Sequence, residues 1–110
     1  MIHQIDPESY LELIQSTAPR LARAKAERTY LEAFSKSLKA ILMKASGQKT
    51  SAAQEVEAYS DPQYIDHLKA LKIAVQGEEE LRWRMVQAEA AIEIFRSREA
   101  SARLMDRAAR

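Results

Sequence analysis

The histidine and carboxylate side chains of this 110-residue chain are the ones that could bind a metal ion or transfer a proton. His3 and His67 lie far apart in the sequence, and neither has a second ligand at helical spacing. Asp66 is adjacent to His67, so on a helix the two side chains diverge and do not chelate one ion together. The consecutive glutamates at 78–80 fan around a helix in the same way. The sequence therefore predicts no metal site, and His67 is expected at a surface or an interface.

Catalytic and cofactor motifs are also missing from the sequence. The chain has no glycine-rich phosphate loop and no nucleophile elbow. It has no cysteine, so disulfides and thiolate zinc sites are excluded, in agreement with a reducing compartment. We therefore expect a protein that is not an enzyme and binds no cofactor.

The sequence carries neither a membrane-spanning pattern nor an export signal. No apolar run approaches the roughly 18 residues that span a bilayer, and the N-terminus has no charged-then-apolar signal pattern. A soluble cytoplasmic protein without membrane contact is expected.

The composition and the positions of glycine and proline predict a single all-α domain over residues 1–110. There are two glycines, three prolines and no alternating β-branched runs. Asp6-Pro7 predicts a short helix within residues 1–17, and Pro19 predicts a new start for a basic helix over about 18–46. Gly47 is the expected C-terminal cap of that helix. In the connector, Ser51 with Gln54 resembles a capping box that opens a brief helix.

Asp61-Pro62 opens the longest predicted helix, over about 62–108. At about 1.5 Å per residue it would be about 70 Å long, more than a compact chain of this size can enclose. We therefore expect an elongated helical hairpin in which this helix packs on the basic helix, with residues 51–110 forming the connector and an oligomerisation helix.

The second half of the long helix has two apolar faces, whereas a surface helix of a monomer needs one. The first face comprises Leu81, Met85, Ala88, Ala91, Ile92 and Phe95. The second, the candidate oligomer interface, comprises Trp83, Val86, Ala90 and Ile94. The alternative for the second face is a third helix of the same chain.

Charge is segregated along the chain, although the net charge is only +1. Residues 18–50 hold eight bases and two acids, whereas residues 51–81 hold seven acids and two bases. The basic helix has a predicted buried arc of Tyr30, Leu31, Phe34, Leu38, Ile41, Leu42 and Ala45. A row of cations on a helix can follow nucleic-acid phosphates, and the candidate DNA-binding residues are Lys25, Arg28, Lys36, Lys39, Lys44 and Lys49. The alternative is that these cations are solvated or pair with the acidic segment.

Residues 38–42 read Leu-Lys-Ala-Ile-Leu and are followed by Ser46-Gly47. This pattern, then a polar connector and a long apolar helix with arginines near its end, resembles the recombination mediator proteins of T-even-type phages over roughly residues 20–106. That family has Leu-Lys-Ala-Arg-Leu at this place. Lys39 matches the motif lysine and is the first candidate for a phosphate contact. Ile41 replaces the motif arginine, and Lys36 and Lys44 are the candidates to compensate for the lost charge. The turn has no arginine after the glycine, although Lys49 lies close by.

The resemblance implies a protein of DNA recombination and repair. It would bind single-stranded DNA, form closed homo-oligomeric rings through its C-terminal helices, and help load a RecA-like recombinase onto DNA coated by a single-strand-binding protein. For a phage-encoded chain the compartment would be the host cytoplasm. With only 6% aromatic residues, binding is expected to be mostly electrostatic. The competing hypothesis is a helical adaptor or assembly protein that does not bind nucleic acid.

Overall fold

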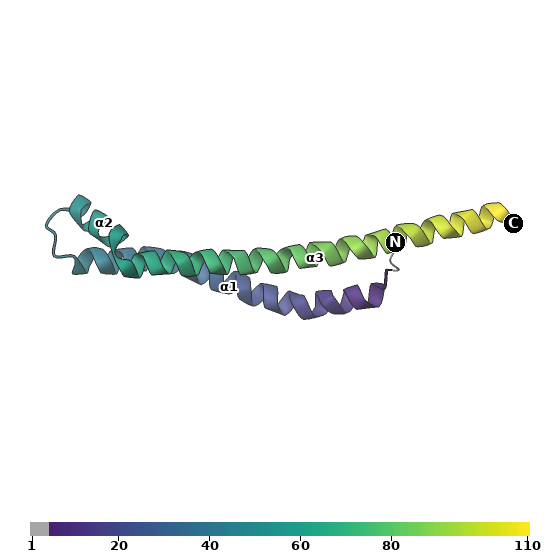
Figure 1. Ribbon diagram of the computed structural model, residues 1–110, viewed down its shortest axis with the longest axis horizontal. Helices are drawn as coiled ribbons and strands as arrows, with labels where there is room; N and C mark the ends of the chain where they lie inside the picture. Colours follow the sequence, from purple (N-terminus) through teal and green to yellow (C-terminus); the bar gives the residue numbers. More distant parts are fainter. Residues whose placement is uncertain (1–4) are drawn as a thin grey trace. The chain divides into compact units, whose positions relative to one another are not determined.

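A computed structural model describes residues 5–110, which form three α-helices and no strand (Figure 1). These are α1 (Pro7–Ala45), α2 (Ser51–Ser60) and α3 (Pro62–Ala109). The predicted all-α class, with a long C-terminal helix packed on a basic helix, is confirmed. None of the described helices combines the length and the apolar character needed to cross a membrane.

One helix replaces the two that were predicted before Gly47. α1 continues through Pro19, and the predicted boundary at residue 17 is absent. A proline inside a helix loses one hydrogen bond and crowds the carbonyl four residues earlier, which here is that of Gln15. Thr17, two residues before the proline, is only 1% exposed, and Leu21, two residues after it, is half-buried. The helix therefore persists because its packing face continues on both sides of the proline.

The predicted stop at the end of α1 is confirmed, and the start of α2 is shifted by one residue. Gly47 has φ of +73°, a left-handed conformation that is accessible to glycine. The cap of α2 is Thr50 and not Ser51, because the Thr50 side chain accepts a hydrogen bond from the Ala53 amide at 3.2 Å. Gln54 instead donates from its side chain to the Gln48 carbonyl at 2.9 Å. The connector is thus folded by local hydrogen bonds.

The two predicted aspartate-proline starts are both confirmed. The Asp61 carboxylate accepts a hydrogen bond from the Gln63 amide at 2.8 Å, immediately before α3. The Asp6 carboxylate accepts one from the Glu8 amide at 3.1 Å, at the start of α1. Each proline follows its cap at the first helical position, where no amide is needed.

A stripe of buried and half-buried residues on α1 recurs in alternating steps of four and three residues: Tyr10, Ile14, Thr17, Leu21, Ala24, Arg28, Leu31, Ser35, Leu38 and Leu42. The corresponding stripe on α3 comprises Tyr64, His67, Leu71, Ala74, Glu78, Leu81, Met85, Ala88, Ile92 and Phe95. This spacing is that of a coiled-coil seam. We call these two sets the packing stripes.

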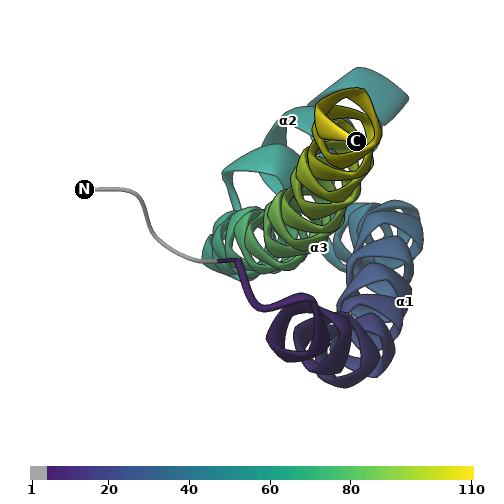
Figure 2. The same ribbon diagram turned by 90° about the vertical axis from the view of Figure 1, so that its right-hand side faces the viewer.

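The chain divides into two compact units, and the first is Ala22–Glu79. Here α1 and the first turns of α3 are antiparallel, because residues 28 and 35 of α1 bond to residues 78 and 67 of α3. The core comprises Leu38, Leu42 and Ala58, with Phe34, Met43 and Tyr64 packed against it. Figure 2, viewed at 90° to Figure 1, shows α2 beside the first turns of α3, and the Tyr59 and Tyr64 rings meet edge-on at 5.2 Å.

The second unit combines residues 5–21 with Glu80–Arg110. Thr17 and Ala88 are its fully buried residues, at 1% and 0% exposure. The predicted inner face of α3 is confirmed, because Leu81, Met85 and Phe95 are half-buried. Every residue in 97–109 is exposed. The last turns of α3 are therefore not covered by the described part of this chain.

The predicted buried arc on the basic helix is too wide. Leu31, Phe34, Leu38 and Leu42 are buried or half-buried, but Tyr30 and Ile41 are 63% and 56% exposed, and Ala45 is exposed too. Two paired helices bury only the seam between them, which is narrower than the apolar stripe of a helix in a globular core.

The contrast between Leu38 and Ile41 gives a stability test, since both are aliphatic residues within one turn of α1. Leu38→Ala removes core packing and should lower the free energy of unfolding by about 2–5 kcal/mol. Ile41→Ala should change it by less than about 0.5 kcal/mol, as surface substitutions usually do. Urea denaturation at one protein concentration measures both. Equal decreases for the two variants would contradict the seam described here.

Candidate nucleic-acid interface

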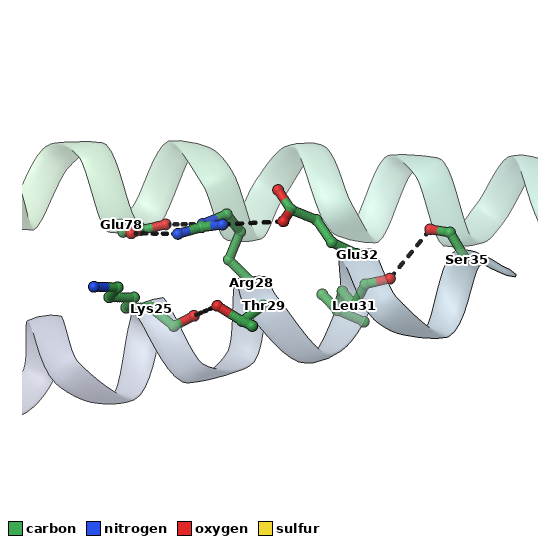
Figure 3. Close-up of polar contacts among 7 residues, drawn as sticks. All are labelled: Lys25, Arg28, Thr29, Leu31, Glu32, Ser35 and Glu78. Carbon is green, nitrogen blue, oxygen red and sulfur yellow. Dashed lines mark hydrogen bonds and ion pairs between the residues drawn. The ribbon is translucent and has the colours of Figure 1, made fainter. Parts of the chain in front are cut away.

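The Arg28 side chain is bonded to two carboxylates of the same chain. Its guanidinium donates to Glu78 of α3, with one contact at 3.1 Å and a second through Nε, and to Glu32 of α1 at 3.0 Å. Figure 3 shows the guanidinium between these two carboxylates. The hydrogen bond with Glu78 raises the pKa of Arg28 above its ordinary value, and the nearby negative charges act in the same direction. The Arg28 charge is therefore compensated within the chain.

Lys39, the lysine of the family motif, is also engaged. Its ammonium donates to Glu55 of α2 at 2.5 Å and lies 4.8 Å from the centre of the Tyr59 ring. The hydrogen bond with Glu55, followed by that with Tyr59, raises the pKa of Lys39 above its ordinary value. These contacts join the end of α1 to α2.

The other four candidate DNA-binding residues are exposed: Lys25, Lys36, Lys44 and Lys49. Within residues 5–110, none of them forms an ion pair. Lys25, whose carbonyl accepts a hydrogen bond from the Thr29 hydroxyl at 2.8 Å, extends its ammonium away from that contact (Figure 3). These four cations are available to an anionic partner.

His67 lies in the seam between α1 and α3 and is 8% exposed. Its Nε2 is 2.9 Å from the Leu31 carbonyl oxygen and 2.7 Å from the Ser35 hydroxyl. Because a carbonyl oxygen can only accept, the contact with Leu31 identifies Nε2 as a donor. Of the two environments expected for His67, the structure shows an interface, and it is one between helices of the same chain.

No group of three His, Cys, Asp or Glu side chains among the described residues could hold a metal ion. Glu78 faces Arg28 rather than its neighbouring glutamates. His3, the other histidine considered from the sequence, lies outside the described residues.

The candidate oligomer interface is exposed on the second unit. Trp83, Val86 and Ile94 are 54%, 40% and 48% exposed, and Ala90 is exposed as well. The Arg82 guanidinium lies 5.0 Å from the centre of the Trp83 ring. Further along α3 the sequence-based set missed two residues, Leu104 and Met105, which are 64% and 73% exposed. Ile94 and Met105 line the same shallow groove, together with Ser97 and Ser101.

Comparison with known proteins does not assign the chain to a family: no protein-family model, curated protein or solved structure matches it. Its function is therefore inferred from the fold and from the distribution of charged and apolar side chains.

The half-buried position of Arg28 and Glu78 predicts a larger coupling free energy than that of an exposed ion pair. Their side chains are 25% and 14% exposed, whereas Arg96 and Glu93, 2.8 Å apart on α3, are 71% and 68% exposed. A double-mutant cycle with alanine at 28 and 78 should give a larger coupling free energy than one at 93 and 96, because water screens the exposed pair. Chemical denaturation provides the free energies. Coupling no larger than at 93 and 96 would contradict the prediction.

Proposed function

We propose that this protein binds single-stranded DNA along α1 and self-associates through α3, as a recombination mediator of the T-even phage type. The observation that supports DNA binding is the exposure of Lys25, Lys36, Lys44 and Lys49 on α1 and the turn after it. Cations that are not paired in the free protein can release the counterions of a phosphate backbone without breaking a bond in the chain.

The division of α1 into a packing side and a solvent side supports the same proposal. Leu38 and Leu42 hold the helix against the core at 8% and 7% exposure, while Lys36 and Lys44 are exposed. A strand bound at these lysines would leave the helical packing unchanged. Because Lys39 already has a carboxylate partner, Lys36 and Lys44 are the better candidates for phosphate contacts.

Self-association is proposed from the exposed face of α3. Trp83, Val86, Ala90 and Ile94 lie opposite the packing stripe, and a second copy of the chain would remove their apolar surface from water. Loading of a RecA-like recombinase onto DNA covered by a single-strand-binding protein extends this proposal and rests on the family resemblance.

A second candidate function is that of an adaptor or assembly protein without nucleic-acid binding. The observation in its favour is that the basic and acidic segments do pair, through Arg28 with Glu78 and Lys39 with Glu55. The two candidates differ in the role they give to the exposed lysines. An adaptor needs them only as solvated groups.

The test for DNA binding is the double variant Lys36→Ala, Lys44→Ala. Affinity for a labelled single strand should fall. The slope of log affinity against log salt should decrease by about 0.7 for each phosphate that the variant no longer binds, counted over every subunit that engages the strand. Alanine favours helix, so folding should be retained. Fluorescence anisotropy over a series of salt concentrations measures both quantities.

The matched control is Lys69→Ala, Lys72→Ala, which removes two exposed lysines from the acidic segment. This variant should bind with a slope closer to that of the wild type. If the wild type fails to bind the strand at low salt, or the Lys36 and Lys44 variant binds as tightly as the wild type at every salt concentration, the adaptor function is the better one.

The test for self-association is Ile94→Arg. Burial of an isoleucine contributes roughly 1.5–3 kcal/mol, and an unpaired charge at an apolar contact opposes association. The variant should therefore have a lower mass than the wild type by light scattering. Ile73→Arg is the control, because Ile73 is 71% exposed on α3 and precedes the first residue of this face, Trp83, by ten residues. A monomeric wild type at micromolar concentration would contradict self-association.

A further inference from the structure

The sequence pattern predicted that the Tyr30 side chain is buried, but the structure shows it at the surface. It is 63% exposed, on the side of α1 that faces away from the packing stripe. Arg23 precedes it by seven residues and Lys44 follows by fourteen, so all three lie on one side of the helix, about 10 and 20 Å apart along its axis. Both cations are exposed.

The Tyr30 ring is supported from inside the chain. It stacks on Phe34 with a centroid distance of 6.0 Å and an angle of 12° between the ring planes. The Phe34 and His67 rings in turn meet edge to face, with their centroids 5.6 Å apart, and His67 is fixed by its contacts with Leu31 and Ser35. One face of Tyr30 is therefore placed against a half-buried aromatic residue, and its exposed surface is turned to solvent.

We propose that Tyr30 is a stacking platform for a nucleobase of bound single-stranded DNA. This inference rests on the proposed function and adds a base contact to the mostly electrostatic binding expected from composition. Stacking on an aromatic ring beside a cationic track is a common mode of single-strand binding, because every base offers a flat π face.

Charge favours a nucleic acid over a partner helix as the occupant of this surface. Over residues 23–44 the exposed cations are Arg23, Lys25, Lys36 and Lys44, against two exposed acids, Glu27 and Glu32, of which Glu32 is bonded to Arg28. A flat apolar ring between cations complements a ligand in which flat bases alternate with phosphates. The neighbouring exposed Ile41 offers further apolar contact to a base.

The experiment compares full-length wild type with Tyr30→Leu and Tyr30→Phe, using a labelled oligothymidylate and an abasic strand of the same length. Tyr30→Leu should weaken oligothymidylate binding by about 5- to 100-fold and leave the salt slope unchanged, because every phosphate contact is retained. Tyr30→Phe retains the ring and should bind nearly as well as the wild type. On the abasic strand, wild type and Tyr30→Leu should bind equally.

Three results would overturn the stacking role: oligothymidylate binding by Tyr30→Leu that equals the wild type, an equal weakening on the abasic strand, or a change in oligomer mass that accounts for the weakening. Failure of stacking alone is recognised when the Lys36 and Lys44 variant still binds more weakly while Tyr30→Leu does not. Failure of the proposed function is recognised when the wild type binds neither strand, which overturns both. Circular dichroism of each variant verifies that the helices remain folded.

Discussion

The packing stripe of α1 against that of α3 is the constraint on which the rest of the structure depends. Two paired helices have one seam, and only a residue on that seam can be fully covered. Among the described residues, the buried hydrophobic side chains are accordingly few: Leu38, Leu42 and Ala88 lie on the seam, and Ala58 lies on α2. A three-layer globule would have covered Tyr30 and Ile41 as well. In this protein both side chains are exposed to solvent, and the outer face of α3 is exposed too.

The seam also contains polar residues, and these restrict how α1 and α3 can align within the unit Ala22–Glu79. Arg28 meets Glu78, and Ser35 meets His67, at positions where a coiled coil usually has aliphatic side chains. A shift of α3 by one heptad moves its side chains about 10 Å along the axis, which would separate the Arg28 and Glu78 charges while both stay half-buried. An unpaired buried charge is costly. The polar pairs therefore disfavour other alignments, which a purely aliphatic seam would tolerate.

Local signals in the sequence predict the helix ends well and the side-chain environments less well. Asp61-Pro62 and Gly47 act through their own backbone and capping chemistry, so their effect is readable without tertiary information. The boundary predicted at Pro19 is wrong because the local cost of the proline is outweighed by packing on both sides of it. The burial predicted for Tyr30 is wrong because periodicity shows which residues share a face, but not how wide the covering partner is.

Arg28 and Lys39 show the same limit for the candidate site. Charge segregation indicates that the basic and acidic segments could pair, but not which cations would be used. The structure brings Arg28 to Glu78 and Lys39 to Glu55, and leaves Lys36 and Lys44 in water. Whether a cation of α1 pairs with a carboxylate depends on its position relative to the seam. At the end of α1, pairing also depends on the turn into α2, which brings Glu55 close to Lys39.

This division of the cations sets a path for the proposed strand. A phosphate that binds Lys39 must either displace Glu55 or approach its negative charge, and so it gains less than at a lysine without an acidic partner. A phosphate that binds Lys36 or Lys44 replaces only water and a counterion. The favoured track is therefore displaced from the motif lysine toward the outer side of α1. That is also the side on which Tyr30 is exposed, so the most available charges and the most available aromatic ring of α1 lie along one route.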